Sequence, residues 1–78
     1  MNIAVVDDEK AIREQVSGFL KKRNPDFNVT GFAAGEELFA AGKNFDIIFL
    51  DIQMEGMGGT AAARTLWQSG ADAVVIFI

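Results

Sequence analysis

The chain has 78 residues, half of them hydrophobic, and its 11 acidic side chains outnumber its 7 basic ones to leave a net charge of −4. This charge repels the phosphate backbone of nucleic acids, so we expect no direct nucleic-acid binding by this segment. With no cysteine and no histidine, disulfides and imidazole ligands are excluded, and carboxylates are the strong metal ligands that remain. No apolar run reaches the roughly 18 residues of a membrane span and no basic leader precedes the first strand, so we expect a cytoplasmic protein without membrane contact.

Three short runs of consecutive apolar residues predict strands that are buried on both faces. They span residues 3–6, 47–50 and 74–78. A continuous apolar run, rather than an alternating one, is typical of a strand in a parallel sheet with helices on both sides. A weaker strand is expected at residues 27–32, because β-branched residues there favour extended structure.

Helices are predicted between these strands. The first spans residues 9–23, where apolar side chains recur at helical spacing. These side chains are Ile12, Val16, Phe19 and Leu20. The charged side chains, Arg13 among them, are assigned to the other faces, and Pro25 ends the helix. A short helix is expected over residues 35–41 and a third from about 60 to 69, each stopped by a glycine.

The order β-α-β-α-β-α-β favours an α/β fold with a parallel sheet and right-handed crossovers. A flavodoxin-like, doubly wound sheet with strand order 2-1-3-4 is the expected solution at this element size. Because the chain ends at Ile78 inside an apolar strand, residues 1–78 are expected to form a truncated domain. The uncovered strand from Val74 to Ile78 is then expected to recruit a second copy of the chain into a homo-oligomer.

Three carboxylates follow two of the predicted strands. Asp7 and Asp8 come directly after the first strand, and Asp51 directly after the third in chain order. Ligands of doubly wound sheets bind beyond the carboxyl ends of the strands, so neighbouring strands would bring the three acids together. Their mutual repulsion calls for a cation or protons, and Mg²⁺ prefers such hard oxygen ligands. For Asp7 or Asp8 taken singly, a solvated loop acid or a cap of the next helix is an equally good explanation.

Asp51 is the candidate nucleophile of this group. Aspartate can attack phosphorus to form an aspartyl-phosphate, and such transfers depend mostly on positioning and charge neutralisation. Asp51 ends the most apolar central strand and stands apart from the acid pair. The glycine-rich loop at residues 54–59 suits either close backbone approach to a ligand or a plain turn.

These motifs resemble the receiver domain of two-component response regulators, over the whole chain. Residues 3–9 are similar to the family's first strand and acid pair, and residues 45–54 to its phosphoacceptor strand and the loop after it. The resemblance implies a signalling phosphoacceptor rather than an enzyme, with a sensor histidine kinase as phosphodonor to Asp51. It also implies that Asp8 and Asp51 bind Mg²⁺ directly, that Asp7 acts largely through water, and that the backbone carbonyl of Gln53 completes the ligands.

Two further expectations come from the same resemblance. The sequence from Asp51 to Met54 is most similar to regulators with a LytTR-type DNA-binding output domain, which makes the parent protein a transcriptional regulator. Receivers also carry a Thr or Ser after the fourth strand and a Lys after the fifth, and both would lie beyond Ile78 with the remaining α-β-α elements. Signalling by this fragment is therefore expected to be crippled even if Mg²⁺ still binds.

Three alternatives remain for comparison. A haloacid dehalogenase-type phosphatase needs a second Asp two positions after its nucleophile, where this chain has Gln53. A flavodoxin-like cofactor binder needs a phosphate-binding loop after the first strand, where Asp7 and Asp8 would repel phosphate. The third alternative is a self-associating fragment that carries out no phosphotransfer, which a concentration-dependent size measurement would detect.

Overall fold

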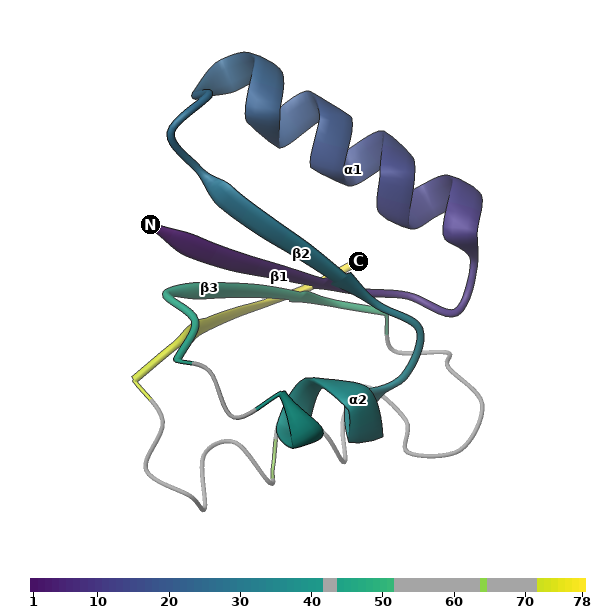
Figure 1. Ribbon diagram of the computed structural model, residues 1–78. Helices are drawn as coiled ribbons and strands as arrows, with labels where there is room; N and C mark the ends of the chain where they lie inside the picture. Colours follow the sequence, from purple (N-terminus) through teal and green to yellow (C-terminus); the bar gives the residue numbers. More distant parts are fainter. Residues whose placement is uncertain (42–43, 52–63, 65–71) are drawn as a thin grey trace.

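The computed structural model describes residues 1–41, 44–51, 64 and 72–78. Figure 1 shows the elements of this part of the chain. They are β1 (Asn2–Val6), α1 (Lys10–Arg23), β2 (Asn28–Phe32), α2 (Gly35–Ala40), β3 (Ile47–Leu50) and β4 (Val74–Phe77). Each agrees with its predicted range to within one residue at either end, as expected for frayed element ends. The helix predicted from about 60 to 69 lies outside the described residues.

The strands form one parallel sheet in the order β2-β1-β3-β4, which confirms the predicted order. Strand β1 is central, because it pairs with β2 on one side and with β3 on the other. The β1–β3 register places Ile3 opposite Ile47 and Val6 opposite Leu50. Strands β1 and β3 therefore end at the same level, which sets the position of whatever follows them.

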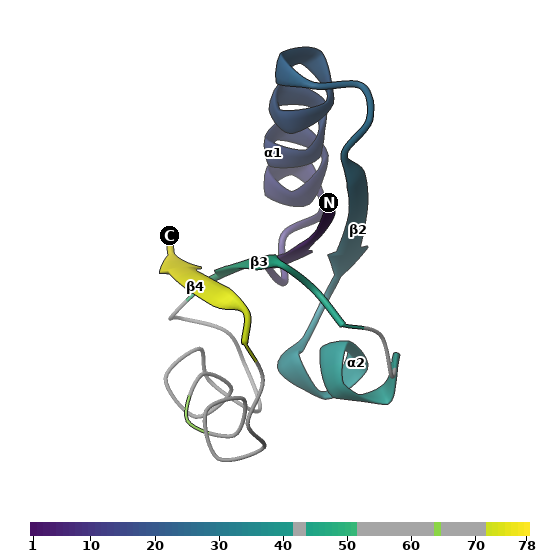
Figure 2. The same cartoon turned by 90° about the vertical axis from the view of Figure 1, so that its left-hand side faces the viewer.

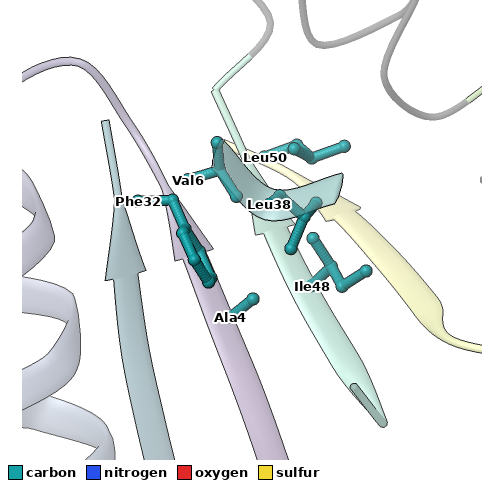
Figure 3. Packing of buried hydrophobic residues seen from close by; sticks show 6 residues of the cluster. All are labelled: Ala4, Val6, Phe32, Leu38, Ile48 and Leu50. Atoms are coloured by element: carbon teal, nitrogen blue, oxygen red, sulfur yellow. The ribbon is translucent and has the colours of Figure 1, made fainter. Parts of the chain in front are cut away.

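Helices cover the two faces of the sheet, α1 on one side and α2 on the other (Figure 1). Successive strand residues point to opposite faces, so each strand must be apolar at consecutive positions. On the α2 side the buried side chains form one cluster (Figure 3). Its members are Ala4, Val6, Phe32, Leu38, Ile48 and Leu50. On the α1 side Ile3 and Val5 are fully buried.

Helix α1 faces the sheet with Ile12, Val16 and Leu20, as predicted, but two of its residues differ from the prediction. Phe19, expected to point inward, is 62% exposed, whereas Arg13, expected on an outer face, is half-buried. At about 100° per residue, Arg13 lies roughly 20° from Leu20 around the helix and Phe19 roughly 100° from it. The sheet-facing side is thus centred near Leu20, and it includes a charged residue.

Strand β4 has β3 as its neighbour within the described sheet, and its apolar side chains are largely exposed. Val74 is 59% exposed and Phe77 43%. Figure 2 shows β4 nearest the viewer, away from α1 and β2. This arrangement agrees with the exposed apolar strand expected from the sequence. Among the described helices none is long and apolar enough to cross a membrane.

Candidate functional site

The acidic residues meet where β1 and β3 end. Val6 pairs with Leu50 across these strands, and the next residue along β3, Asp51, donates its backbone N–H to the carbonyl of Val6 at 3.0 Å. Asp7, Asp8 and Asp51 each offer a carboxylate oxygen, and these oxygens all lie within 4.8 Å of one another. The predicted convergence of the three carboxylates is confirmed as geometry.

The three carboxylates differ in their exposure to solvent. Asp7 is only 5% exposed, Asp51 is half-buried and Asp8 is exposed. The backbone N–H of Asp7 donates to the carbonyl of Phe32 at 3.0 Å, which ties the residue to β2. The cluster is therefore closed toward the sheet and open to solvent at Asp8.

Burial raises the pKa of the Asp7 carboxyl above its usual value. The hydrogen bond that its Oδ1 accepts from the backbone N–H of Glu9, at 2.9 Å, acts in the opposite direction. The negative charges of Asp51 and Asp8 raise the pKa further, because they disfavour a third charge nearby. Without a cation, burial and mutual repulsion destabilise the ionised carboxylates of the cluster. Binding of a proton or a metal ion reduces this repulsion.

The alternative explanation for Asp7, a loop acid that supports the start of the next helix, is partly correct. Its bond with the N–H of Glu9 closes the turn that leads into α1, and Glu9 is the residue that precedes the helix. One carboxylate oxygen of Asp7 thus has a structural role, which does not require the other two acids. The proximity of Asp8 and Asp51 has no such local explanation, since Asp51 comes from a different strand.

Arg13 makes a contact that the sequence pattern did not predict. Its guanidinium Nη1 donates to the backbone carbonyl of Asp7 at 2.7 Å. The signal that could have found it is the helical position of Arg13, close to Leu20 on the side that faces the sheet. Gln53, expected to offer a backbone carbonyl to the metal, lies outside the described residues, as do residues 54–59 of the glycine-rich loop.

Residues 3–78 match the family model of the response regulator receiver domain. The chain belongs to the response regulator receiver family. A receiver is a signalling phosphoacceptor rather than an enzyme, so the phosphatase and cofactor-binding alternatives are not supported. The flavodoxin-like fold with its four-stranded parallel sheet agrees with this membership.

Among curated proteins, the chain is similar to the transcriptional regulatory protein YvrH of Bacillus subtilis, with 37% identity over 99% of this chain and 32% of the relative. Among solved structures, it is similar to the response regulator TrrA of Thermotoga maritima in complex with Mg²⁺-BeF, with 32% identity, a TM-score of 0.88, and coverage of 97% of this chain and 66% of that one. The chain thus spans about a third of the curated relative.

A third relative corrects the expected subfamily. DrrB of Thermotoga maritima, described as an OmpR/PhoB homologue, is 29% identical with a TM-score of 0.86, over 97% of this chain and 34% of that one. This relative is of the OmpR/PhoB type rather than the LytTR type. The LytTR expectation, which rested on residues 51–54 alone, was wrong, because four residues carry little information about a separate output domain.

Proposed function

We propose that this receiver accepts a phosphoryl group on Asp51, with Mg²⁺ held by the acid cluster. The observation that carries the proposal is the approach of the Asp7, Asp8 and Asp51 carboxylate oxygens to within 4.8 Å of one another at the ends of β1 and β3. Three carboxylates at this spacing suit a hard divalent cation bound through oxygen. The structure of TrrA with Mg²⁺-BeF, a relative of the same fold, supports the assignment.

Each acid has its own part in the proposal. Asp8 and Asp51 would bind the ion directly, because Asp8 faces solvent and Asp51 lies beside it. Buried Asp7 would act largely through a water molecule, and the backbone carbonyl of Gln53 would complete the protein ligands. Mg²⁺ supplies neutralisation of the charge on the carboxylates and on the incoming phosphoryl oxygens.

In the proposed step, a carboxylate oxygen of Asp51 forms a bond to phosphorus while the phosphorus–nitrogen bond of a phosphohistidine breaks. The imidazole nitrogen leaves with the electron pair of that bond. The transfer therefore needs no oxidant or reductant. Asp51 is suited to the attack, because its backbone is fixed by the bond from its N–H to the carbonyl of Val6. A fixed nucleophile lowers the barrier mainly through positioning.

The partner in this step would be a sensor histidine kinase in the cytoplasm, and the parent protein would be a DNA-binding transcriptional regulator. The similarity to YvrH supports the regulatory output. Residues 1–78 would form part of a receiver domain, in keeping with their coverage of 66% of the TrrA chain. DNA binding would belong to another part of such a protein, since this segment carries a net charge of −4.

Intact-mass measurement after incubation with Mg²⁺ and acetyl phosphate tests the proposal. The unmodified chain should gain the mass of one phosphoryl group, and Asp51→Asn should gain none. Asp26→Asn is the matched control, because Asp26 is an exposed acid in the turn between α1 and β2. Equal phosphorylation of the Asp51→Asn chain would contradict the assignment.

A second candidate is a self-associating fragment without phosphotransfer, favoured by the exposed apolar side chains of β4. Another copy would add its own strand to this edge and form a homo-oligomer. Absence of phosphoryl gain in the unmodified chain, together with a size that increases with concentration, would favour this candidate.

A further inference from the structure

The peptide group between Asp7 and Asp8 is held by a residue from α1. Arg13 Nη1 donates to the Asp7 carbonyl at 2.7 Å, a short distance that is typical of a charge-assisted hydrogen bond. The side chain of Asp7 is held in the same turn, because its Oδ1 accepts a hydrogen bond from the backbone N–H of Glu9 at 2.9 Å. The two bonds fix the segment from which the exposed Asp8 carboxylate projects toward Asp51.

The position of Arg13 is in turn set by β2. Gly31 lies beneath the arginine stem, and a Cβ atom built on Gly31 would sit 3.4 Å from the Cδ atom and 3.7 Å from the Nε atom of Arg13. A side chain larger than alanine at this position would occupy the space of the stem. Gly31 pairs with Val5 of the central strand, so the arginine crosses the sheet face from β2 to the end of β1.

We propose that Arg13 is a positioning residue of the receiver site. It holds the Asp7–Asp8 peptide in the orientation that Mg²⁺ binding needs, and Gly31 leaves the space that the arginine side chain occupies. This inference rests on the proposed function, because it concerns the same acid cluster. Arg13 contacts backbone and not the ion. Groups that orient metal ligands in this way commonly change metal affinity by about tenfold or more when removed.

Charge and positioning make opposite predictions for Arg13. Loss of a positive charge beside three carboxylates strengthens the attraction for Mg²⁺, whereas loss of the hydrogen bond weakens the site. Lys10 provides the matched control, because it lies in the first turn of the same helix, forms an ion pair with exposed Glu14, and carries the same charge as Arg13. Lys10→Met therefore removes one positive charge from the same helix while the hydrogen bond from Arg13 to the Asp7 carbonyl stays in place.

The experiment is calorimetric titration of the 78-residue chain with MgCl₂, comparing Arg13→Met with Lys10→Met. Both variants are first shown to be folded by circular dichroism and urea unfolding in EDTA. We expect Arg13→Met to bind Mg²⁺ about tenfold more weakly than the unmodified chain, and Lys10→Met to bind it equally or more tightly. In the metal-free chains, amide hydrogen exchange at Glu9 should be faster in Arg13→Met than in Lys10→Met. Equal Mg²⁺ affinity of the two variants would overturn the inference, even if Arg13→Met were less stable to urea.

Gly31→Val gives a second, charge-neutral route to the same displacement, with Gly31→Ala as its control. The valine variant should weaken Mg²⁺ binding while the alanine variant leaves it unchanged. The double variant Arg13→Met/Gly31→Val should bind Mg²⁺ no more weakly than Arg13→Met does, because both substitutions disrupt the same contact of Arg13 with the Asp7 carbonyl. Additive losses of Mg²⁺ affinity would overturn the inference that Gly31 acts by leaving space for the Arg13 side chain. Failure of the unmodified chain to bind Mg²⁺ would overturn the proposed function and this inference together.

Discussion

Neutralising Asp7 is expected to stabilise the chain when no divalent cation is present. Asp7 is only 5% exposed, and its carboxylate lies in a group whose oxygens are within 4.8 Å of those of Asp8 and Asp51. Asp7→Asn removes the buried charge and keeps an Oδ1 atom that can accept the N–H of Glu9. The substitution thus removes repulsion and burial of charge while it preserves the turn into α1.

The size of the effect follows from the spacing of the carboxylates. At an effective dielectric constant of about 20, two unit charges about 5 Å apart repel each other by roughly 3 kcal/mol. Solvent around exposed Asp8 and half-buried Asp51 reduces this value, so we expect a net gain of about 1–2 kcal/mol in the free energy of unfolding. For a domain of this size the gain corresponds to an increase in Tm of roughly 5–12 °C.

The pH dependence follows from the raised pKa of Asp7. The folded chain keeps the Asp7 proton to a higher pH than the unfolded chain does, so stability falls as the pH rises from the unfolded value through the raised folded value. The loss is complete above the folded pKa and absent below the unfolded one. The advantage of Asp7→Asn should therefore grow across this window and stay constant above it.

Thermal unfolding followed by circular dichroism in EDTA, at low salt and over a series of pH values, measures this difference. Asp26→Asn controls for the change in net charge, because Asp26 lies in the turn between α1 and β2, outside the acid cluster. Addition of Mg²⁺ should raise the Tm of the unmodified chain more than that of Asp7→Asn, because ligand binding stabilises the state that binds it. A Tm of Asp7→Asn equal to or below that of the unmodified chain in EDTA at neutral pH would refute the reasoning.

Two further predictions concern the sheet. Leu50→Ala removes a fully buried side chain at the end of β3 and should lower the free energy of unfolding by about 3 kcal/mol, measured by urea denaturation; a loss below about 1 kcal/mol would mean that the cluster on the α2 side is loosely packed. Ile76→Lys places a charge on partly exposed β4 and should abolish concentration-dependent association in sedimentation analysis, because charged side chains block strand pairing at a sheet edge. Association that persists in Ile76→Lys would place the contact elsewhere.

Several features of the fold could be predicted because they depend on local composition. Continuous apolar runs identified β1, β3 and β4, since a strand buried on both faces must be apolar at successive positions. The weaker strand β2 was also predicted, although it contains Gly31. The face of α1 was predicted less well, because its apolar stripe includes Phe19, which lies at the margin of the buried side.

The position of Arg13 shows why the rest could not be predicted. Hydrophobicity assigns a charged residue to solvent, but a long side chain can lie along a sheet and deliver its charged end to a backbone carbonyl. Here that arrangement depends on Gly31 of β2 and on the carbonyl of Asp7 just after β1, which are 18 and 6 residues away from Arg13 in the chain. The hydrophobic periodicity of α1 contains no information about the space that another strand leaves for this side chain.

The amino-acid sequence specifies which segments form strands and helices, and it places an acidic residue directly after each of two buried strands. Whether those acids meet depends on the arrangement of the strands in space, because their proximity requires β1 and β3 to be neighbours in register, with Val6 opposite Leu50. The raised pKa of Asp7 has a similar origin, since it comes first from burial and then in part from the charge of Asp51, which follows another strand. Local residue patterns specify elements through short-range preferences, whereas the site is made by contacts between elements that are distant in the chain.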